Sequence, residues 1–225
     1  MCIRKNCTVL FLWLALLSAC EKDENAGGAQ RIQMTAIPLT DTLAHILVEN
    51  TLLTNTHPWY INGWVYLGNE ATLHIEPGTV VRIIPDKQQG GGLVITRGAK
   101  LIASGLSDRP IRFELNDTVS NCSTGWTGLI LLGKAPQEQS YKVLENVATL
   151  PNSGGLAYGG ADLADSSGIL QHVWIAGVSC NGPAIKDRLP AGLLLLGTGS
   201  RTVIKDVMIQ PLGEKPFYLK RTRLP

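Results

Sequence analysis

Two carboxylates in a short polar segment, Asp162 and Asp165, come closest to a catalytic pair in type and spacing. Hydrolysis of a glycosidic bond needs two carboxyl groups placed against that bond, because one donates a proton while the other accepts one or attacks. Carboxylate oxygens in a loop also suit Ca²⁺. Asp and Ser more often stabilise turns by hydrogen bonding to nearby backbone, and we favour this interpretation. We therefore assign no catalytic residue and treat Asp162 and Asp165 as a candidate cation or ligand loop.

A second polar group, Arg201, Lys205 and Asp206, follows near the end of the chain. Successive side chains of a strand point to opposite faces, so Arg201 and Lys205 share the face of Val203, while Asp206 points the other way with Ile204. An outward polar face explains this pattern more simply than a catalytic group does. The chain has four histidines, and they are isolated from one another without the spacing of metal ligands.

The aromatic residues provide the strongest indication of binding. Trp59 and Trp64 lie close together with two tyrosines, and Trp126 and Trp174 follow further along the chain. Flat aromatic rings on a rigid scaffold can stack on sugars, which makes Trp59, Trp64 and Trp126 candidates for contact with a glycan. The alternative, which we favour for the first cluster, is that these rings cover the open N-terminal end of a repeat structure.

Of five cysteines, Cys122 and Cys180 lie in the body of the chain, well beyond the N-terminal segment. In an exported protein such a pair can form a disulfide, and two buried free thiols are the alternative. A zinc site is a weaker explanation, because two thiols without neighbouring histidines do not complete its usual four ligands.

The N-terminal segment has the parts of an export signal. Arg4 and Lys5 precede an apolar run, Val9 to Leu17, which is too short to cross a bilayer and is followed by small residues. The string Leu17-Ser18-Ala19-Cys20 resembles the lipobox of bacterial lipoproteins, in which the cysteine becomes the lipid-bearing N-terminus. Several acyl chains, such as palmitate, on one residue anchor a protein stably. The resemblance implies that Cys20 carries the lipid and residues 1–19 are removed.

The segment after Cys20 is polar and glycine-containing, which predicts a flexible tether over residues 20–45. Its Lys22-Asp23-Glu24 resembles the signal that sends lipoproteins of the Bacteroidetes to the outer face of the outer membrane. The sequence therefore predicts a lipid-anchored, surface-exposed protein. Without the signal, which contains two basic residues and no acidic one, the 20 basic and 18 acidic residues become equal in number. A balanced charge argues against nucleic acid as a partner.

The elements that must position these residues are short strands. Runs of Val, Ile and Leu alternate with Gly, Pro and Asn, and Leu73-His74-Ile75-Glu76-Pro77-Gly78 recurs about twenty residues later as Leu93-Val94-Ile95-Thr96-Arg97-Gly98. In both copies the first and third residues would point inward, and His74, Glu76, Val94 and Thr96 outward. A same-register repeat of this kind predicts an all-β solenoid of stacked coils and counts against an antiparallel β-sandwich.

The motifs together resemble a family of Bacteroidetes surface or secreted proteins with a right-handed parallel β-helix and no assigned function. The resemblance spans roughly residues 60–209 and rests on Ala71-Thr72-Leu73-His74-Ile75-Glu76-Pro77-Gly78-Thr79, Gly125-Trp126-Thr127-Gly128-Leu129-Ile130-Leu131 and Gly197-Thr198-Gly199-Ser200-Arg201-Thr202. It implies a single β-helix domain over residues 46–209. Residues 210–225 depart from the family, which usually continues with further coils. They contain three prolines and a basic bias, and we expect an irregular tail of a truncated member.

Three functions stay open on this basis. A structural, adhesive or glycan-binding surface module, without catalysis and with glycans or surface proteins as partners, fits the anchor and the rigid scaffold best. A β-helix polysaccharide lyase or hydrolase fits the fold by analogy alone. A truncated, non-functional fragment fits the unusual tail. No cofactor is implied other than Ca²⁺ in the Asp162–Asp165 loop.

Overall fold

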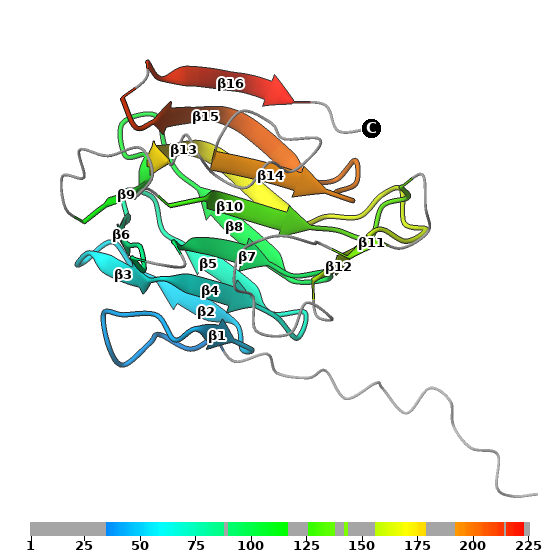
Figure 1. Ribbon diagram of the computed structural model, residues 1–225, viewed down its shortest axis with the longest axis horizontal. Coiled ribbons are helices and arrows are strands. Elements are labelled where there is room, and N and C mark those ends of the chain that lie inside the picture. Colours follow the sequence, from blue (N-terminus) through cyan, green and yellow to red (C-terminus); the bar gives the residue numbers. More distant parts are fainter. Residues whose placement is uncertain are drawn as a thin grey trace, which may run out of the picture. The chain divides into compact units, whose positions relative to one another are not determined.

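The computed structural model describes residues 35–87, 90–116, 126–137, 142–143, 156–178, 192–213 and 215–222 (Figure 1). The regular elements in these ranges are β-strands, which confirms the all-β class. Their bounds are β1 (Ile46–Leu47), β2 (Thr51–Leu53), β3 (Trp59–Asn62), β4 (Trp64–Leu67), β5 (Thr72–Ile75), β6 (Val80–Ile84), β7 (Gly92–Ile95), β8 (Lys100–Ser104), β9 (Ile111–Leu115), β10 (Gly128–Leu132), β11 (Lys142–Val143), β12 (Ala157–Tyr158), β13 (Gly168–Val178), β14 (Gly192–Leu196), β15 (Val203–Pro211) and β16 (Phe217–Thr222).

The strands of residues 34–225 form three faces of a coil. Face 1 is the parallel sheet β1-β4-β7-β10-β14, which faces the viewer in Figure 1. Face 2 contains β2, β5, β8 and the first halves of β13 and β15, and face 3 contains β3, β6, β9 and their second halves. The coils of β1–β9 contribute one strand to each face, whereas β13 and β15 each span faces 2 and 3, and successive coils pair in parallel. This arrangement is the predicted right-handed parallel β-helix.

The interior of the coil is a single apolar core. On face 1, Val65, Leu93, Leu129 and Leu193 stack through the parallel pairing, and none is more than 1% exposed. Fully burying each such side chain contributes about 1.5–3 kcal/mol. Alternate residues of short strands supply the core, because successive side chains point to opposite faces of the sheet.

The repeat of about twenty residues does not correspond to one coil. Leu73 pairs with Leu101, and Leu93 pairs with Leu129, so the two matched segments lie on different faces. What recurs is a local unit of strand, corner and strand: β5 and β6 form one copy, and β7 and β8 form the other. The self-similarity therefore identified the corner, while the connections between corners differ in length from coil to coil.

One residue that points outward, as predicted, is nevertheless buried. Val94 points away from the core, yet it is fully buried in a second apolar cluster on the outside of face 1. The other members include Trp64, Ile130 and Leu194, and Tyr158 packs against them. Face 1 is thus apolar on both sides, because Leu156 and Tyr158, which follow β10 in the chain, pack on its outer surface.

The β-helix begins earlier than expected. Ala36 forms a parallel bridge with Thr51, Thr42 forms one with Tyr60, and Leu43 is only 4% exposed. The described residues at the end of the predicted 20–45 tether are therefore part of the first coil. Backbone hydrogen bonds from this segment to the edges of β2 and β3 explain the difference, because they pair strand edges that would otherwise be open.

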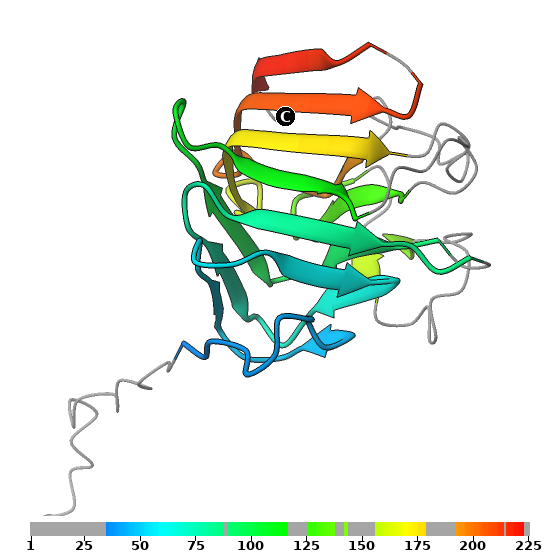
Figure 2. The same ribbon diagram turned by 90° about the vertical axis from the view of Figure 1, so that its left-hand side faces the viewer.

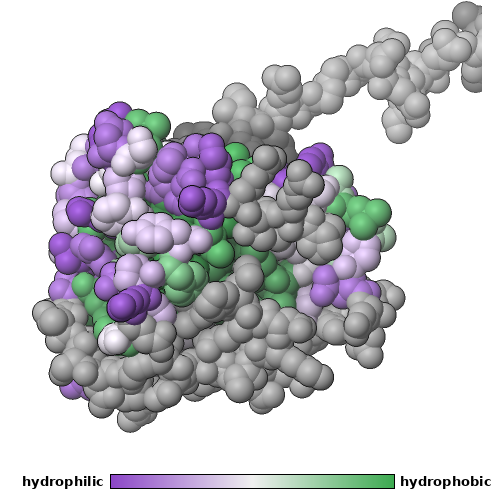
Figure 3. Space-filling model, turned by 90° about the horizontal axis from the view of Figure 1, so that it is seen from above, coloured by the Kyte–Doolittle hydropathy of each residue, from purple (hydrophilic) through white to green (hydrophobic). Residues whose placement is uncertain are grey.

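The C-terminal tail is also more ordered than expected. Within residues 210–225, β15 extends to Pro211 and β16 pairs antiparallel with β15. Phe217 and Leu219 pack against the core, while Tyr218 and Lys220 are exposed. With this alternation, β16 covers the edge of the last coil. The three prolines of residues 210–225 hid this strand in the sequence. Figure 2 shows β16 at the top of face 3, and Figure 3 shows hydrophilic residues on the described surface of this end with apolar residues between them.

Candidate functional site

The Asp162–Asp165 loop connects β12 to β13 and contacts the corner between β14 and β15. Asp162 Oδ1 accepts a hydrogen bond of 3.0 Å from the backbone N–H of Ala164. Asp165 is 6% exposed, and its Oδ2 accepts a hydrogen bond of 3.2 Å from the Ser167 hydroxyl. These are the local hydrogen bonds that the turn interpretation predicts.

Arg201 joins this loop to the last coil. Its Nε donates to the carbonyl oxygen of Ala164, and its Nη2 lies 3.8 Å from Asp162 Oδ2. The backbone N–H of Arg201 donates to the carbonyl of Asp165 over 3.3 Å. The structure thus brings together the Asp162–Asp165 loop and Arg201, which the sequence analysis treated separately. Their contacts hold the connection between β12 and β13 against the corner between β14 and β15.

The described residues contain no group of three or more His, Cys, Asp or Glu side chains placed to hold a metal ion. Asp162 and Asp165 supply two carboxylates, one of which already accepts a hydrogen bond from Ser167. Ca²⁺ usually takes six to eight oxygen ligands. Binding of Ca²⁺ to this loop stays a prediction.

Lys205 and Asp206 occupy a corner between faces 2 and 3. Lys205 points outward with Val203, as predicted, and Ile204 points into the core. Asp206 does not follow Ile204 inward, which corrects the sequence interpretation. Its φ of 52° turns the chain there, and its Oδ2 lies 3.9 Å from His172 Nε2 and 4.0 Å from Lys205 Nζ. The bend breaks the period of two, so the residue stays partly exposed.

The three tryptophans proposed for glycan stacking are buried. Trp59 is 1% and Trp126 is 0% exposed, both within the core, and Trp64 is 7% exposed in the second cluster. The indole N–H of Trp59 donates to the carbonyl of Thr54, and that of Trp126 donates to the carbonyl of Ala176. The prediction of sugar contacts at Trp59, Trp64 and Trp126 is therefore wrong. Trp59 lies in β3, whose outer edge already pairs with the segment around Thr42, so the cap interpretation stays a prediction.

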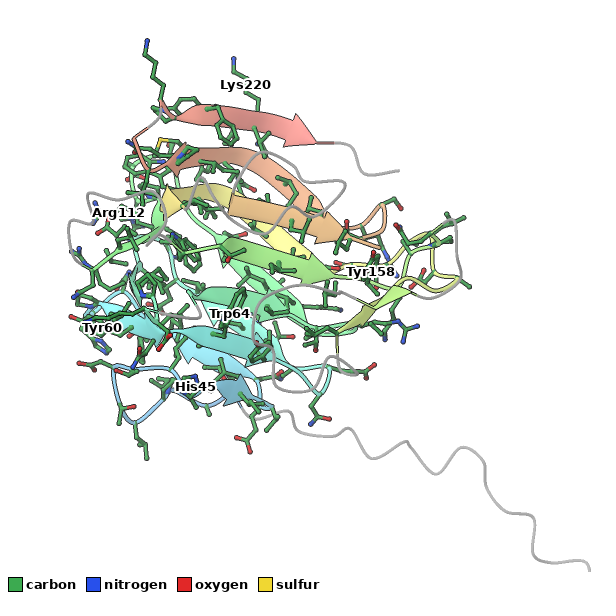
Figure 4. The ribbon with its side chains drawn as sticks, viewed as in Figure 1. His45, Tyr60, Trp64, Arg112, Tyr158 and Lys220 are labelled. Atoms are coloured by element: carbon green, nitrogen blue, oxygen red, sulfur yellow. The ribbon has the colours of Figure 1, made fainter. Side chains whose placement is uncertain are left out.

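Exposed aromatic rings occur on face 3 instead. Trp174 of β13 is 40% exposed, and Tyr218 of β16 is 64% exposed. Pairing aligns Arg112, Trp174, Met208 and Tyr218 across β9, β13, β15 and β16. We call these four residues the aromatic row; it crosses the strands of the face seen in Figure 2. Figure 4 labels Arg112 on that side of the molecule and Lys220 at the top.

Sequence reasoning passed over this row for two reasons. Trp174 stands between Val173 and Ile175 in an apolar run, and Tyr218 stands in a segment expected to be irregular. Successive side chains of a strand point to opposite faces, so alternation alone would have placed both rings on the face opposite to their buried neighbours. The row itself could not have been found, because it depends on which strands are neighbours.

Two titratable groups near face 1 have shifted pKa values. Burial raises the pKa of Tyr66 to about 12, and among the described residues its buried hydroxyl has no hydrogen-bond partner. The pKa of Glu70 is lowered, because Lys134 Nζ donates a hydrogen bond of 2.9 Å to its Oε1 and carries a positive charge. Glu70 lies at the corner after β4 and Lys134 lies after β10, so this exposed ion pair spans two coils.

Cys20, Cys122 and Cys180 lie outside the described residues, so lipidation and the disulfide stay predictions. In the part of the chain that is described, no helix is long and apolar enough to cross a membrane.

Comparison with known proteins relates residues 45–211 to one family model, described as a pectate-lyase-like β-helix domain. No curated protein and no solved structure matches the chain. The matched range begins near β1 and ends with the last residue of β15.

Proposed function

This chain belongs to the pectate-lyase-like β-helix domain family, and we propose that it serves as a non-catalytic scaffold at the bacterial cell surface. In this proposal, lipid on Cys20 anchors the protein to the outer face of the outer membrane. The β-helix then presents its outer faces to ligands or to other surface proteins. A fold alone does not establish an activity, so the proposal rests on what the polar side chains do.

The observation that carries the proposal is the structural use of Asp162 and Asp165. Asp162 accepts from the backbone of its own turn, and Asp165 is buried against Ser167. Arg201, a neighbouring basic group, bonds to the same loop. Glycosidic hydrolysis needs two carboxyl groups that face one substrate bond. Side chains held this way are better suited to fixing a corner of the coil.

Anchoring is tested by fractionating cells that express the full chain. Cys20→Ser should move the protein from the membrane to the soluble fraction and remove labelling by a palmitate analogue, because lipid is the only anchor proposed. Cys122→Ser serves as the matched control and should stay membrane-bound. Membrane retention and continued lipid labelling of Cys20→Ser would contradict the anchor.

The absence of catalysis is tested with purified protein on a panel of pectins, alginates and host glycans, with and without Ca²⁺. The family description makes a lyase the main alternative, and lyase activity would release unsaturated products that absorb ultraviolet light. We expect no depolymerisation. Cleavage of any substrate would overturn the scaffold proposal, and its loss in Asp162→Ala or Asp165→Ala would identify those carboxylates as catalytic.

A further inference from the structure

We propose that the aromatic row on face 3 binds a linear oligosaccharide, with sugar rings stacked on Trp174 and Tyr218. This inference rests on the proposed function as a surface scaffold and supplies that scaffold with a ligand. The site differs from the one expected from sequence, because Trp59, Trp64 and Trp126 are buried.

The spacing of the row suits an extended ligand. Trp174 registers with Met208, and Met208 registers with Tyr218, so the two rings are separated by two strand intervals. Neighbouring strands lie about 4.8 Å apart, which places the attachment points of the rings roughly 10 Å apart. Met208 is only partly exposed between them and provides an apolar floor. Two projecting rings on either side of a lower floor can hold two separate units of one sugar chain that runs across the strands.

The core does not account for the exposure of these rings. Val173 and Ile175, on either side of Trp174, point inward and are fully buried, as are Val207 and Ile209 on β15. Trp174 therefore stands on the outer surface of a strand whose inner surface already completes the core. A tryptophan there exposes a large amphipathic ring to solvent, and such a ring stacks favourably on an apolar ligand face.

A cation lies beside each of the two aromatic rings. Arg112 is exposed beside Trp174, and Lys220 is exposed two residues beyond Tyr218. Neither cation is in an ion pair with the described residues, whereas Arg82 pairs with Glu114 over 3.2 Å on the same face. An arginine offers five N–H donors, so Arg112 can bond to hydroxyl or carboxylate oxygens of a sugar stacked on Trp174.

The shape of the row favours a sugar chain over a protein partner. A stable protein interface buries about 800 Å² on each side around an apolar centre. The aromatic row is one residue wide, and Val80 of β6 registers with Arg112 and continues it. The outward residues of the neighbouring row are Arg82, Glu114, Ala176 and Gln210, of which only Ala176 is apolar. A narrow apolar strip with hydrogen-bonding edges matches a ligand that has apolar ring faces and a polar rim.

The test measures binding of the full-length protein to hexasaccharides by calorimetry. Neutral probes are cello- and xylo-oligosaccharides, and acidic probes are oligogalacturonates and oligomannuronates. Trp174→Ala and Tyr218→Ala should each weaken binding about tenfold, as expected for the loss of roughly 1.4 kcal/mol of stacking. Trp174→Phe should restore part of the affinity. Val203→Ala, at an exposed apolar position on face 2, is the matched control and should bind like the unmodified protein.

Arg112→Ala separates the two ligand classes, because it should weaken acidic probes more than neutral ones. Unchanged circular dichroism and melting temperature will show that the variants are folded. The proposal fails if no probe binds, or if a probe binds and both aromatic variants retain full affinity. It also fails if the aromatic variants abolish self-association in sedimentation while no sugar binds, which would make the row an interface between copies. Release of cleavage products would instead count against the scaffold proposal, so the two failures are distinguishable.

Discussion

Replacing Gly128 by alanine should separate the contribution of coil stacking from that of backbone conformation. Gly128 begins β10 and registers with Gly192 of the next coil. A Cβ added there would lie 2.0 Å from the Gly192 carbonyl oxygen and 2.4 Å from its Cα. The φ of Gly128 is also +107°, a conformation that residues with side chains rarely adopt.

The expected loss of stability has two parts. Holding a non-glycine residue in a sparsely populated backbone conformation costs about 1–3 kcal/mol. Relief of the contact requires the two strands to separate by about 1 Å at this end, since Cβ atoms essentially never approach within 3.0 Å. Hydrogen bonds between β10 and β14 would then weaken, at about 1 kcal/mol each. With two of these hydrogen bonds lost, we expect a total loss of about 3–5 kcal/mol.

Gly213→Ala is the matched control. Gly213 has a φ of +73°, and nothing lies within 4 Å of a Cβ built there, so this variant carries only the backbone cost of about 1–2 kcal/mol. Urea unfolding followed by circular dichroism gives both values from the midpoint at an unchanged slope. If Gly128→Ala destabilises no more than Gly213→Ala, close approach of the coils at Gly128 does not contribute, and the steric reasoning is refuted.

The remaining predictions concern single side chains. The folded-state pKa of Tyr66 is raised to about 12, above its unfolded value of about 10, so the stability from its neutral form is present below pH 10 and lost as the pH rises to 12. Alkaline unfolding should therefore be less steep in Tyr66→Phe; identical alkaline curves would contradict this. Trp126→Ala should cost about 3–5 kcal/mol in urea unfolding, because the ring is fully buried, and a loss below 1 kcal/mol would show that it does not fill the core. Leu219→Asp should lower the melting temperature more than Tyr218→Asp, since Leu219 packs against the core and Tyr218 is exposed; equal melting temperatures would argue against β16 as the cover of the last coil.

The sequence was sufficient to predict the class of fold, because that prediction depends on local patterns. Alternation in segments such as Leu73–Ile75 places apolar residues on one face of a strand, and glycine-containing corners separate the strands. The outward position of Lys205 followed from the same rule. The turn-forming bond of Asp162 is equally local, since its partner is only two residues away.

Features that depend on neighbours distant in the chain were decided by the tertiary structure alone. Alternation states which way Val94 points, but only the segment returning over face 1 makes that outward position buried. The coils differ in length, so the pairing of Leu73 with Leu101, and the alignment of Arg112 with Trp174, cannot be read from a fixed period. The residue type alone does not say whether a tryptophan fills the core, as Trp126 does, or stands on the surface, as Trp174 does. Burial and cross-strand alignment are properties of stacked coils, and no single segment of the sequence contains them.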